Sequence, residues 1–359
     1  MARVRVLVMG GTRFNGLSLV RELVGAGHDV AVLNRGVTAA TLPGGVRRLV
    51  ADRSDRAQLH AALGGAEFDC VHDVSGYRPG EVSATIELLQ GRVGHYVFVS
   101  STVIYAPSDL LPITEDHPVD RSARQNEYGL HKLLCEDLLF DAHARAGFPA
   151  TVAALSMVLG PGNIVPDREQ RMFARLLEGR PVLVPGDGTT LGQVGYVDDQ
   201  SVALRMMMGN ERTFGRRYNV TGDQYHTDDG YVATIADVVG VTPTLLHLPA
   251  RMMDDLWDGR IPLDGGAVAV DDAAVMRQRW QLSMLVQRMA PNLHRWNHSV
   301  LFSVDRLRED VGWRPAHRLR QMVEETYGWW RHLPAGERAT FDFGWEDALA
   351  GRLRGRPEG

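Results

Sequence analysis

Short apolar runs alternate with longer amphipathic stretches along the first half of the chain. Runs rich in β-branched residues predict strands at residues 4–9, 29–33, 47–50, 70–74, 95–100 and 150–155. Between the first two strands, apolar residues recur at helical spacing from Leu17 to Val24, and Gly27 follows as a stop signal. This alternation is typical of a parallel sheet wrapped by helices on both faces, so the pattern predicts an α/β, Rossmann-type doubly wound fold.

The regular alternation ends after Gly160-Pro161-Gly162, where loops, single helices and short strands at 182–184, 194–197 and 218–220 take over. We expect residues 1–160, with strands returning from 194–220, to form the main domain. Residues 161–193 and 221–350 then form a smaller C-terminal lobe, and 351–359 a tail. The Met-, Arg- and Trp-rich stretch 271–296 indicates either a core helix, which we favour, or part of a substrate cover.

The composition is that of a soluble globular protein, with 44% hydrophobic and 23% charged residues. A net charge of -5 provides no basic field for a nucleic-acid backbone, so nucleic acid is not the expected partner. Cys70 and Cys135 lie in predicted core elements without metal-ligand spacing, which indicates reduced thiols, no metal site and a cytoplasmic location. The first apolar run, of about six residues, is too short to cross a membrane.

The first predicted strand ends in a glycine-bearing turn, and a helix follows it. Gly10 permits the tight turn and Gly16 permits close packing of the helix, while the helix N-terminus offers free N–H groups to a pyrophosphate. A purely structural turn is the alternative, and the clear βαβ context favours the dinucleotide site. We expect cofactor contacts from the turn and from later strand ends, namely Gly10, Thr12, Arg13, Phe14, Asn15, Gly16, Asn34, Arg35, Asp52, Arg53, Ser75, Lys132 and Ser156.

The end of the second strand carries Asn34 and Arg35 where an acidic residue would hold the ribose hydroxyls of NAD. A missing acid with a nearby arginine favours a 2′-phosphate, and Arg13 adds a second cation. The cofactor is therefore expected to be NAD(P), with NADP preferred over NAD, unless Arg35 is only a solvated loop charge. Asp52 and Arg53 are placed either to touch the adenine or to face solvent.

Tyr128 and Lys132 stand four residues apart, which places both side chains on one face of a helix. A nearby ammonium can lower the phenol pKa from about 10 by roughly 1–3 units, towards the range of a general acid or base. The spacing alone is a loose pattern, but Lys132 is the one lysine among 39 basic residues. Because a titratable ammonium is not interchangeable with a guanidinium, this exception favours a catalytic couple over a chance pairing.

Hydroxyl groups follow the fifth predicted strand at Ser100, Ser101 and Thr102. Parallel sheets bind ligands at the carboxyl ends of their strands, so Ser101 is the expected third catalytic residue, with a simple strand-ending turn as the alternative.

With these residues in place, the chain resembles the extended short-chain dehydrogenase/reductase superfamily, specifically the NAD-dependent epimerase/dehydratase group. Within it, the chain looks closest to the branch of chloroplast stem-loop-binding proteins and their bacterial relatives, which mixes proposed enzymes with RNA-associated proteins. The matching blocks, in order, are residues 10–16, 100–105, 113–116, 128–136, 158–162, 196–199, 218–223 and 311–315. The resemblance implies an enzyme with a small-molecule substrate and a homodimer formed through the helix that bears Tyr128.

The departures from that group narrow the expected chemistry. Thr102 and Val103 stand where 4,6-dehydratases usually carry an Asp-Glu pair, and Gly192 stands where many epimerases have an arginine for the substrate diphosphate. We therefore expect an epimerase that oxidises a secondary alcohol of a sugar nucleotide or similar substrate and returns the hydride. A net dehydrogenase or ketoreductase is the alternative, and an RNA-binding Rossmann protein is a third hypothesis. Candidate substrate contacts are Thr102, Asn163, Arg168 and Gln193.

Overall fold

A computed structural model of the protein describes residues 3–263, 272–289, 296 and 298–355. In these residues seven parallel strands form one sheet: β1 (Arg5–Met9), β2 (Asp29–Asn34), β3 (Arg47–Val50), β4 (Cys70–Asp73), β5 (Tyr96–Ser101), β6 (Ala150–Leu155) and β11 (Arg216–Val220). Their order is β11-β6-β5-β4-β1-β2-β3, so that β1 pairs with both β2 and β4. The predicted Rossmann-type α/β fold is confirmed.

The strand predictions agree closely with the observed sheet. β3 and β6 have the predicted bounds, and β5 runs one residue further than predicted because Ser101 pairs with Leu155 of the neighbouring strand. This extension carries Ser101 to the carboxyl edge of the sheet, where the predicted site lies.

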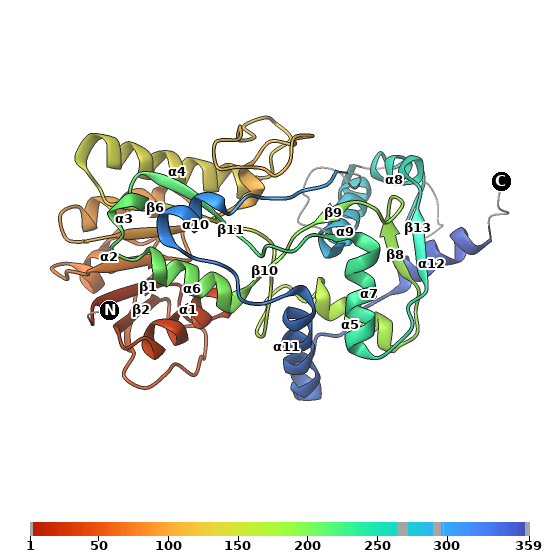
Figure 1. Ribbon diagram of the computed structural model, residues 1–359, viewed down its shortest axis with the longest axis horizontal. Coiled ribbons are helices and arrows are strands. Elements are labelled where there is room, and N and C mark those ends of the chain that lie inside the picture. Colours follow the sequence, from red (N-terminus) through yellow and green to blue (C-terminus); the bar gives the residue numbers. More distant parts are fainter. Residues whose placement is uncertain (1–2, 264–271, 290–295, 297, 356–359) are drawn as a thin grey trace.

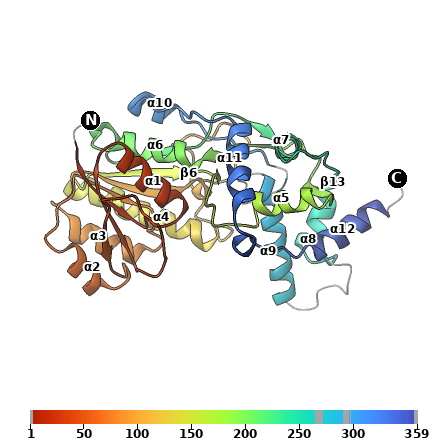
Figure 2. The ribbon, with the colours of Figure 1, turned by 90° about the horizontal axis from the view of Figure 1, so that it is seen from below.

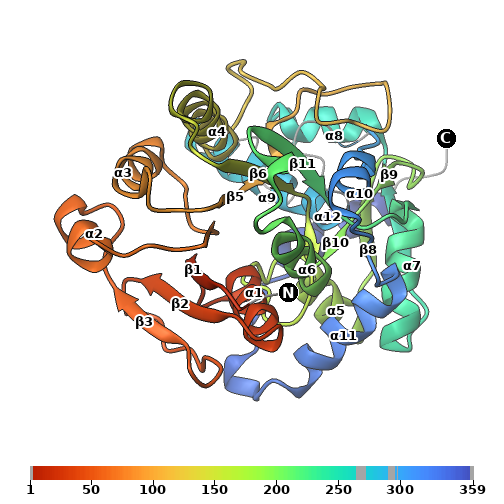
Figure 3. The ribbon, with the colours of Figure 1, turned by 60° about the vertical axis from the view of Figure 1, so that its left-hand side comes forward.

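Helices cover both faces of the sheet (Figure 3). The helices of this lobe are α1 (Phe14–Gly25), α2 (Arg56–Leu63), α3 (Pro79–Leu89), α4 (Glu127–Ala146), α6 (Val197–Met207) and α10 (Asp305–Val311). Because strand side chains alternate between faces, Val6 and Val8 of β1 enter one core with α1 and α6, while Leu7 and Met9 enter the other core beside α2, α3 and α4. All four side chains are buried, so the strand is apolar on both faces.

A smaller lobe lies beside the sheet-containing lobe (Figures 1 and 2). Its parallel strand pair joins β8 (Val182–Pro185) to β13 (Leu245–Leu248). Its helices are α5 (Glu169–Leu177), α7 (Asp228–Val239), α8 (Ala250–Trp257), α9 (Asp272–Met289), α11 (Leu319–His332) and α12 (Gly344–Arg354). Two-residue strands occur near the junction of the lobes: β7 (Val158–Leu159), β9 (Leu191–Gly192), β10 (Gly195–Tyr196) and β12 (His226–Thr227). Three short 3-10 helices complete the described elements: η1 (Thr102–Ile104), η2 (Glu211–Thr213) and η3 (Ala335–Glu337).

The boundary between the lobes differs from the predicted one. Of the expected returning strands, only β11 joins the main sheet, because β10 pairs with β7 and Val197 already begins α6. In addition, the segment around α10 returns to the first lobe, where Val304, Leu307 and Trp313 are buried in the core that α1 and α6 share. The hydrophobic pattern did not reveal this return because the segment is short and polar on its other face.

One further prediction needs correction, and another agrees with the structure. The expected tail at 351–359 begins too early, since α12 continues to Arg354 and is anchored by the buried residues Leu349 and Ala350. The stretch 271–296 contains a core helix, as favoured, with Leu282 and Leu285 buried on α9. Residues 271, 290–295 and 297 lie outside the described residues.

Candidate active site

A cleft of about 1340 Å³ opens at the carboxyl ends of the sheet strands and reaches the second lobe at Trp257, Ser283 and Gln287. Ordinary small-molecule pockets occupy about 300–1,000 Å³, so this cleft has room for a dinucleotide together with a substrate. It is lined by every residue predicted to contact the cofactor, namely Gly10, Thr12, Arg13, Phe14, Asn15, Gly16, Asn34, Arg35, Asp52, Arg53, Ser75, Lys132 and Ser156. The structure therefore gathers residues from five strand ends into one space.

The turn between β1 and α1 has no room for side chains at its glycines. A Cβ atom on Gly16 would lie 2.1 Å from the carbonyl oxygen of Gly10, and one on Gly10, whose φ is +95°, would lie 2.7 Å from Cβ of Ser75. Arg13 occupies the middle of the turn without strain because its backbone is extended, with φ of -141°. Phe14 begins α1 with φ of +35°, an unusual value for a residue with a side chain. The cradle that a pyrophosphate requires is present.

The end of β2 presents an unpaired donor to the cleft. The Oδ1 atom of Asn34 accepts a hydrogen bond of 2.9 Å from the backbone N–H of Gly36, whereas Nδ2 is buried and has no partner in the described residues. Arg35 is exposed at the same edge, and Asp52 is occupied by the backbone N–H and hydroxyl of Ser54. These groups fit the oxygen-rich adenosine half of NAD(P).

Arg53 lines the cleft, but its guanidinium is turned inward. It donates to the two carboxylate oxygens of Asp73 at 2.5 and 2.8 Å and to the Ser75 hydroxyl at 3.1 Å. The Tyr96 hydroxyl donates to the same carboxylate at 2.5 Å. Burial alone would raise the pKa of Asp73, but the charge and hydrogen bonds of Arg53 hold it below its usual value. Arg53 is therefore not the surface residue that the sequence offered as one alternative, and its guanidinium is committed to Asp73.

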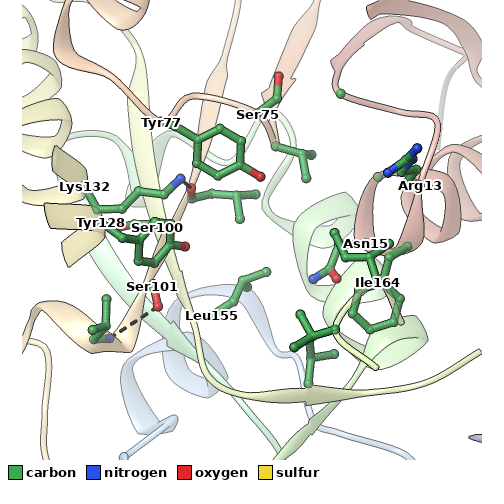
Figure 4. A pocket seen from close by; sticks show the side chains of 18 of the residues that line it. Arg13, Asn15, Ser75, Tyr77, Ser100, Ser101, Tyr128, Lys132, Leu155 and Ile164 are labelled. Carbon is green, nitrogen blue, oxygen red and sulfur yellow. Dashed lines mark hydrogen bonds between the residues drawn. The ribbon is translucent and has the colours of Figure 1, made fainter. Parts of the chain in front are cut away.

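Ser101, Tyr128 and Lys132 lie together on one side of the cleft, opposite Arg13 and Asn15 (Figure 4). Asn126 caps α4 by accepting from the N–H of Gly129, and this helix start presents Tyr128 to the cleft. Tyr128 remains 45% exposed, as a group that meets a substrate must. The geometry of the predicted triad is thus present.

Lys132 is almost completely enclosed, with 1% of its surface exposed. Its ammonium donates to the carbonyl oxygens of Gly76 at 2.8 Å and Val99 at 2.7 Å. The same group lies 4.8 Å from the centre of the Tyr77 ring and 5.7 Å from that of Tyr128. Because an ammonium has three N–H donors, one remains for a ligand in the cleft.

The pKa values differ from the sequence-based expectation. Burial raises the pKa of Tyr128 to about 12, although a hydrogen bond with Ser101 and the charge of Arg168 act in the opposite direction. Burial also lowers the pKa of Lys132 to about 8, against the raising effect of Asp73. The prediction that Lys132 lowers the tyrosine pKa was therefore wrong for the protein alone. Burial thus shifts the pKa of each group towards its neutral form, but Lys132, with a pKa of about 8, is still mostly an ammonium at pH 7.

Three of the four predicted substrate contacts line the cleft, and one does not. Thr102, Asn163 and Arg168 line the cleft, although the Asn163 amide donates to Glu169 at 2.7 Å and is thereby occupied. Gln193 does not line the cleft, and this prediction needs correction. Its amide is buried among backbone groups, donating to Gly222 and accepting from the N–H of Phe302 at 2.7 Å.

The sequence analysis missed several residues that line the cleft: Tyr77, Arg78, Glu81, Arg124, Trp257, Ser283 and Gln287. Tyr77 follows Ser75 in the loop after β4, so its place at a strand end was a usable signal. Ser283 and Gln287 stand four residues apart on one face of α9, so the core helix also borders the cleft.

Within the ranges that the structure describes, no cluster of His, Cys, Asp and Glu side chains has the arrangement of a metal site. No helix among the same residues combines the length and apolar character that a bilayer-crossing segment needs.

Comparison with known proteins places this cleft in a family context. Residues 6–221 match the model of the NAD dependent epimerase/dehydratase family. The chain belongs to this family. The resemblance inferred from the sequence motifs is thereby confirmed, and the protein is an NAD(P)-dependent epimerase or oxidoreductase of the extended short-chain dehydrogenase type.

Three curated relatives show the range of this family. The chain is 33% identical over 264 residues to the chloroplast stem-loop binding protein of 41 kDa b of Arabidopsis thaliana, covering 70% of this chain and 67% of that protein. It is 28% identical to 2'-dehydrokanamycin reductase of Streptomyces kanamyceticus, covering 59% and 60% of the two chains. It is 24% identical to UDP-glucose 4-epimerase of Lactobacillus helveticus, covering 93% and 99%.

A solved structure extends the comparison to the fold. The epimerase Mth375 of Methanothermobacter thermautotrophicus superposes with a TM-score of 0.68 over 92% of each chain, at 19% sequence identity. The two-lobed architecture is thus shared at low sequence identity.

Proposed function

We propose that this protein is an NAD(P)-dependent epimerase that oxidises a secondary alcohol of a sugar nucleotide or nucleotide-like substrate and returns the hydride to the opposite face. The observation that carries this proposal is one cleft that joins the glycine cradle at Gly10 to Ser101, Tyr128 and Lys132. The family match and the UDP-glucose 4-epimerase relative support it.

Each residue of the triad has a definite task in this reaction. Bound NAD(P) supplies the acceptor and donor of the hydride. Tyr128, as its phenolate, takes the proton of the substrate hydroxyl during oxidation and gives the same proton back during reduction. Because the hydride also returns to the substrate carbon, no net redox change results. Ser101 donates a hydrogen bond to the substrate oxygen, and Lys132 orients the cofactor with its remaining N–H.

The residues beside Ser101 favour this reaction over dehydration. Thr102 and Val103 are buried in η1 and supply no carboxyl group to remove a proton and protonate a leaving hydroxyl. The family also contains dehydratases, but these two positions lack the acid–base pair that elimination needs.

A labelling experiment tests the proposal. The NAD(P)-loaded protein is incubated with UDP- and dTDP-sugars that carry deuterium at each secondary carbinol in turn, and the products are separated by chromatography and mass spectrometry. We expect a stereoisomer that retains its deuterium, without accumulation of reduced cofactor, and no product from the Tyr128→Phe variant. Stoichiometric accumulation of reduced cofactor would contradict epimerisation.

We also propose that the cofactor is NADP rather than NAD. The unpaired Asn34 amide and the cations Arg35 and Arg13 line the adenosine end of the cleft, and the carboxylate that would hold ribose hydroxyls is absent from position 34. A charge-assisted hydrogen bond contributes about 1.5–3 kcal/mol, so Arg35→Gln is expected to weaken NADP binding about 10- to 100-fold and leave NAD binding unchanged. Equal loss for both cofactors in a calorimetric titration would refute this preference.

A net ketoreductase is the second candidate. The identity to 2'-dehydrokanamycin reductase favours it, as does the neutral form of Tyr128, because a protonated phenol is the form that a carbonyl reduction requires. Rapid exchange of the cofactor during turnover would support this candidate, whereas cofactor retained through purification would support the epimerase.

A further inference from the structure

We propose that Arg168 binds an anionic oxygen group, a carboxylate or a phosphate, that the substrate carries beside the carbon that reacts at Tyr128. This inference rests on the proposed function, since it specifies the substrate class of the same cleft. It is carried by the position of Arg168, the lack of a partner for its side chain and the charges of the surrounding residues.

Arg168 precedes α5 and lines the cleft, with its Nε atom buried. Its side chain makes no hydrogen bond or ion pair with any residue of the described ranges. The next two arginines of this segment differ, because Arg171 contacts Glu346 and Arg175 donates to Asp347 at 2.9 Å. A buried donor without a partner is destabilising, and an acceptor supplied by a ligand would remove this cost.

The glutamate that follows Arg168 does not neutralise it. Glu169 is buried. One of its carboxylate oxygens accepts the Asn163 amide at 2.7 Å, and the other has no partner among the described residues. Burial raises the pKa of Glu169 to about 7, so at neutral pH the carboxyl is protonated in a large fraction of molecules. Arg168 therefore keeps a net positive charge at the cleft wall.

The charge of Arg168 reaches the reacting end of the cleft, since it acts to lower the pKa of Tyr128. Arg124 lines the same cleft and lies two residues before Asn126, the N-cap of the helix that bears Tyr128, so it adds a second cation to this side of the lining. The two carboxylates among the described lining residues, Asp52 and Glu81, belong to the cofactor half, where Asp52 bonds to Ser54 and Glu81 lies 3.5 Å from Arg53. The substrate half is thus positive, which favours an anionic ligand.

Binding measurements with two matched ligand pairs test this inference on the NAD(P)-loaded protein. UDP-glucuronic acid and UDP-glucose differ by a carboxylate, while glucose 6-phosphate and glucose differ by a phosphate. Titration calorimetry at constant ionic strength compares the wild type with Arg168→Gln. Arg251→Gln, on the exposed surface of α8, is the control.

We expect the anionic member of at least one pair to bind about 10- to 100-fold more tightly to the wild type, as for hydrogen bonds between charged groups. Arg168→Gln should abolish this preference for the anionic ligand and leave NADP affinity unchanged. Arg168→Lys should retain part of the preference, and Arg251→Gln should not change it. The pair that responds tells whether a carboxylate or a phosphate is bound.

An unchanged ratio in Arg168→Gln, or no preference for the anionic member of either pair in the wild type, would overturn the inference. Failure of the redox proposal is detected separately, because the labelling experiment measures turnover and these titrations measure binding alone.

Discussion

The buried pair of Arg53 and Asp73 yields a quantitative prediction for Arg53→Met. The substitution removes the two hydrogen bonds to the Asp73 carboxylate, at 2.5 and 2.8 Å. It leaves the negative charge of Asp73, whose side chain is 0% exposed, without its cationic partner. Breaking a buried ion pair by removing one partner costs about 3–5 kcal/mol. Asp73 keeps the Tyr96 hydroxyl and the N–H of Ser75, so we expect the lower end, about 3 kcal/mol of unfolding free energy.

The loss depends on pH in a defined direction. In the wild type the depressed pKa of Asp73 contributes stability above its unfolded pKa of about 3.9, and this contribution is lost as the pH falls through the folded value. In Arg53→Met burial dominates and raises the Asp73 pKa, so protonation at mildly acidic pH relieves the variant. The difference between the two proteins should therefore shrink between pH 7 and pH 5.

Urea unfolding followed by tryptophan fluorescence at both pH values measures this difference, with equal m-values required for the comparison. Arg56→Met is the matched control, because Arg56 pairs with Glu87 at 2.5 Å but both side chains are mostly exposed. Such surface pairs contribute about 0–1 kcal/mol. A loss below about 1 kcal/mol in Arg53→Met, or a loss independent of pH, would refute the reasoning.

Three further predictions concern the cleft. Tyr128→Phe should lower kcat about 100- to 10,000-fold, as loss of general acid–base catalysis does, and should retain cofactor affinity. Steady-state kinetics measures kcat, and an equilibrium titration measures the affinity; a parallel loss of cofactor affinity would contradict this prediction. For the wild type, activity should fall above pH about 8 because the Lys132 ammonium is lost as the pH rises through its pKa. Lys132→Arg should lose most of its activity and about 1–3 kcal/mol of unfolding free energy, because the larger guanidinium overpacks the site. Its residual activity should not fall near pH 8. A fully active variant would contradict the role of Lys132. Gly16→Ala should abolish cofactor binding in a fluorescence titration, since its Cβ would lie 2.1 Å from the Gly10 oxygen, and unchanged affinity would argue against the cradle.

The parts of the site that the sequence predicted depend on local spacing. The glycines at 10 and 16 and the pair Tyr128 and Lys132 act within one turn or one helix, so their geometry follows from the period of the element that carries them. The alternation of apolar runs predicted the sheet for the same reason.

The errors arise where contacts join residues far apart in the chain. Gln193 is fixed by Gly222 and Phe302, and Arg53 by Asp73, and none of these partners could be identified from spacing alone. The pKa of Tyr128 was misjudged because burial, which outweighs the hydrogen bond of Ser101 and the charge of Arg168, is a property of the complete fold.

The return of Val304, Leu307 and Trp313 to the first lobe has a consequence for biosynthesis. The Trp313 indole donates to the backbone of Asp199 at 3.1 Å, so residues made late in translation complete a core whose first strand is made at the start. Domains generally fold from the N-terminus during synthesis. The part of this core that Val304, Leu307 and Trp313 contribute is therefore completed only after residue 313 has been synthesised.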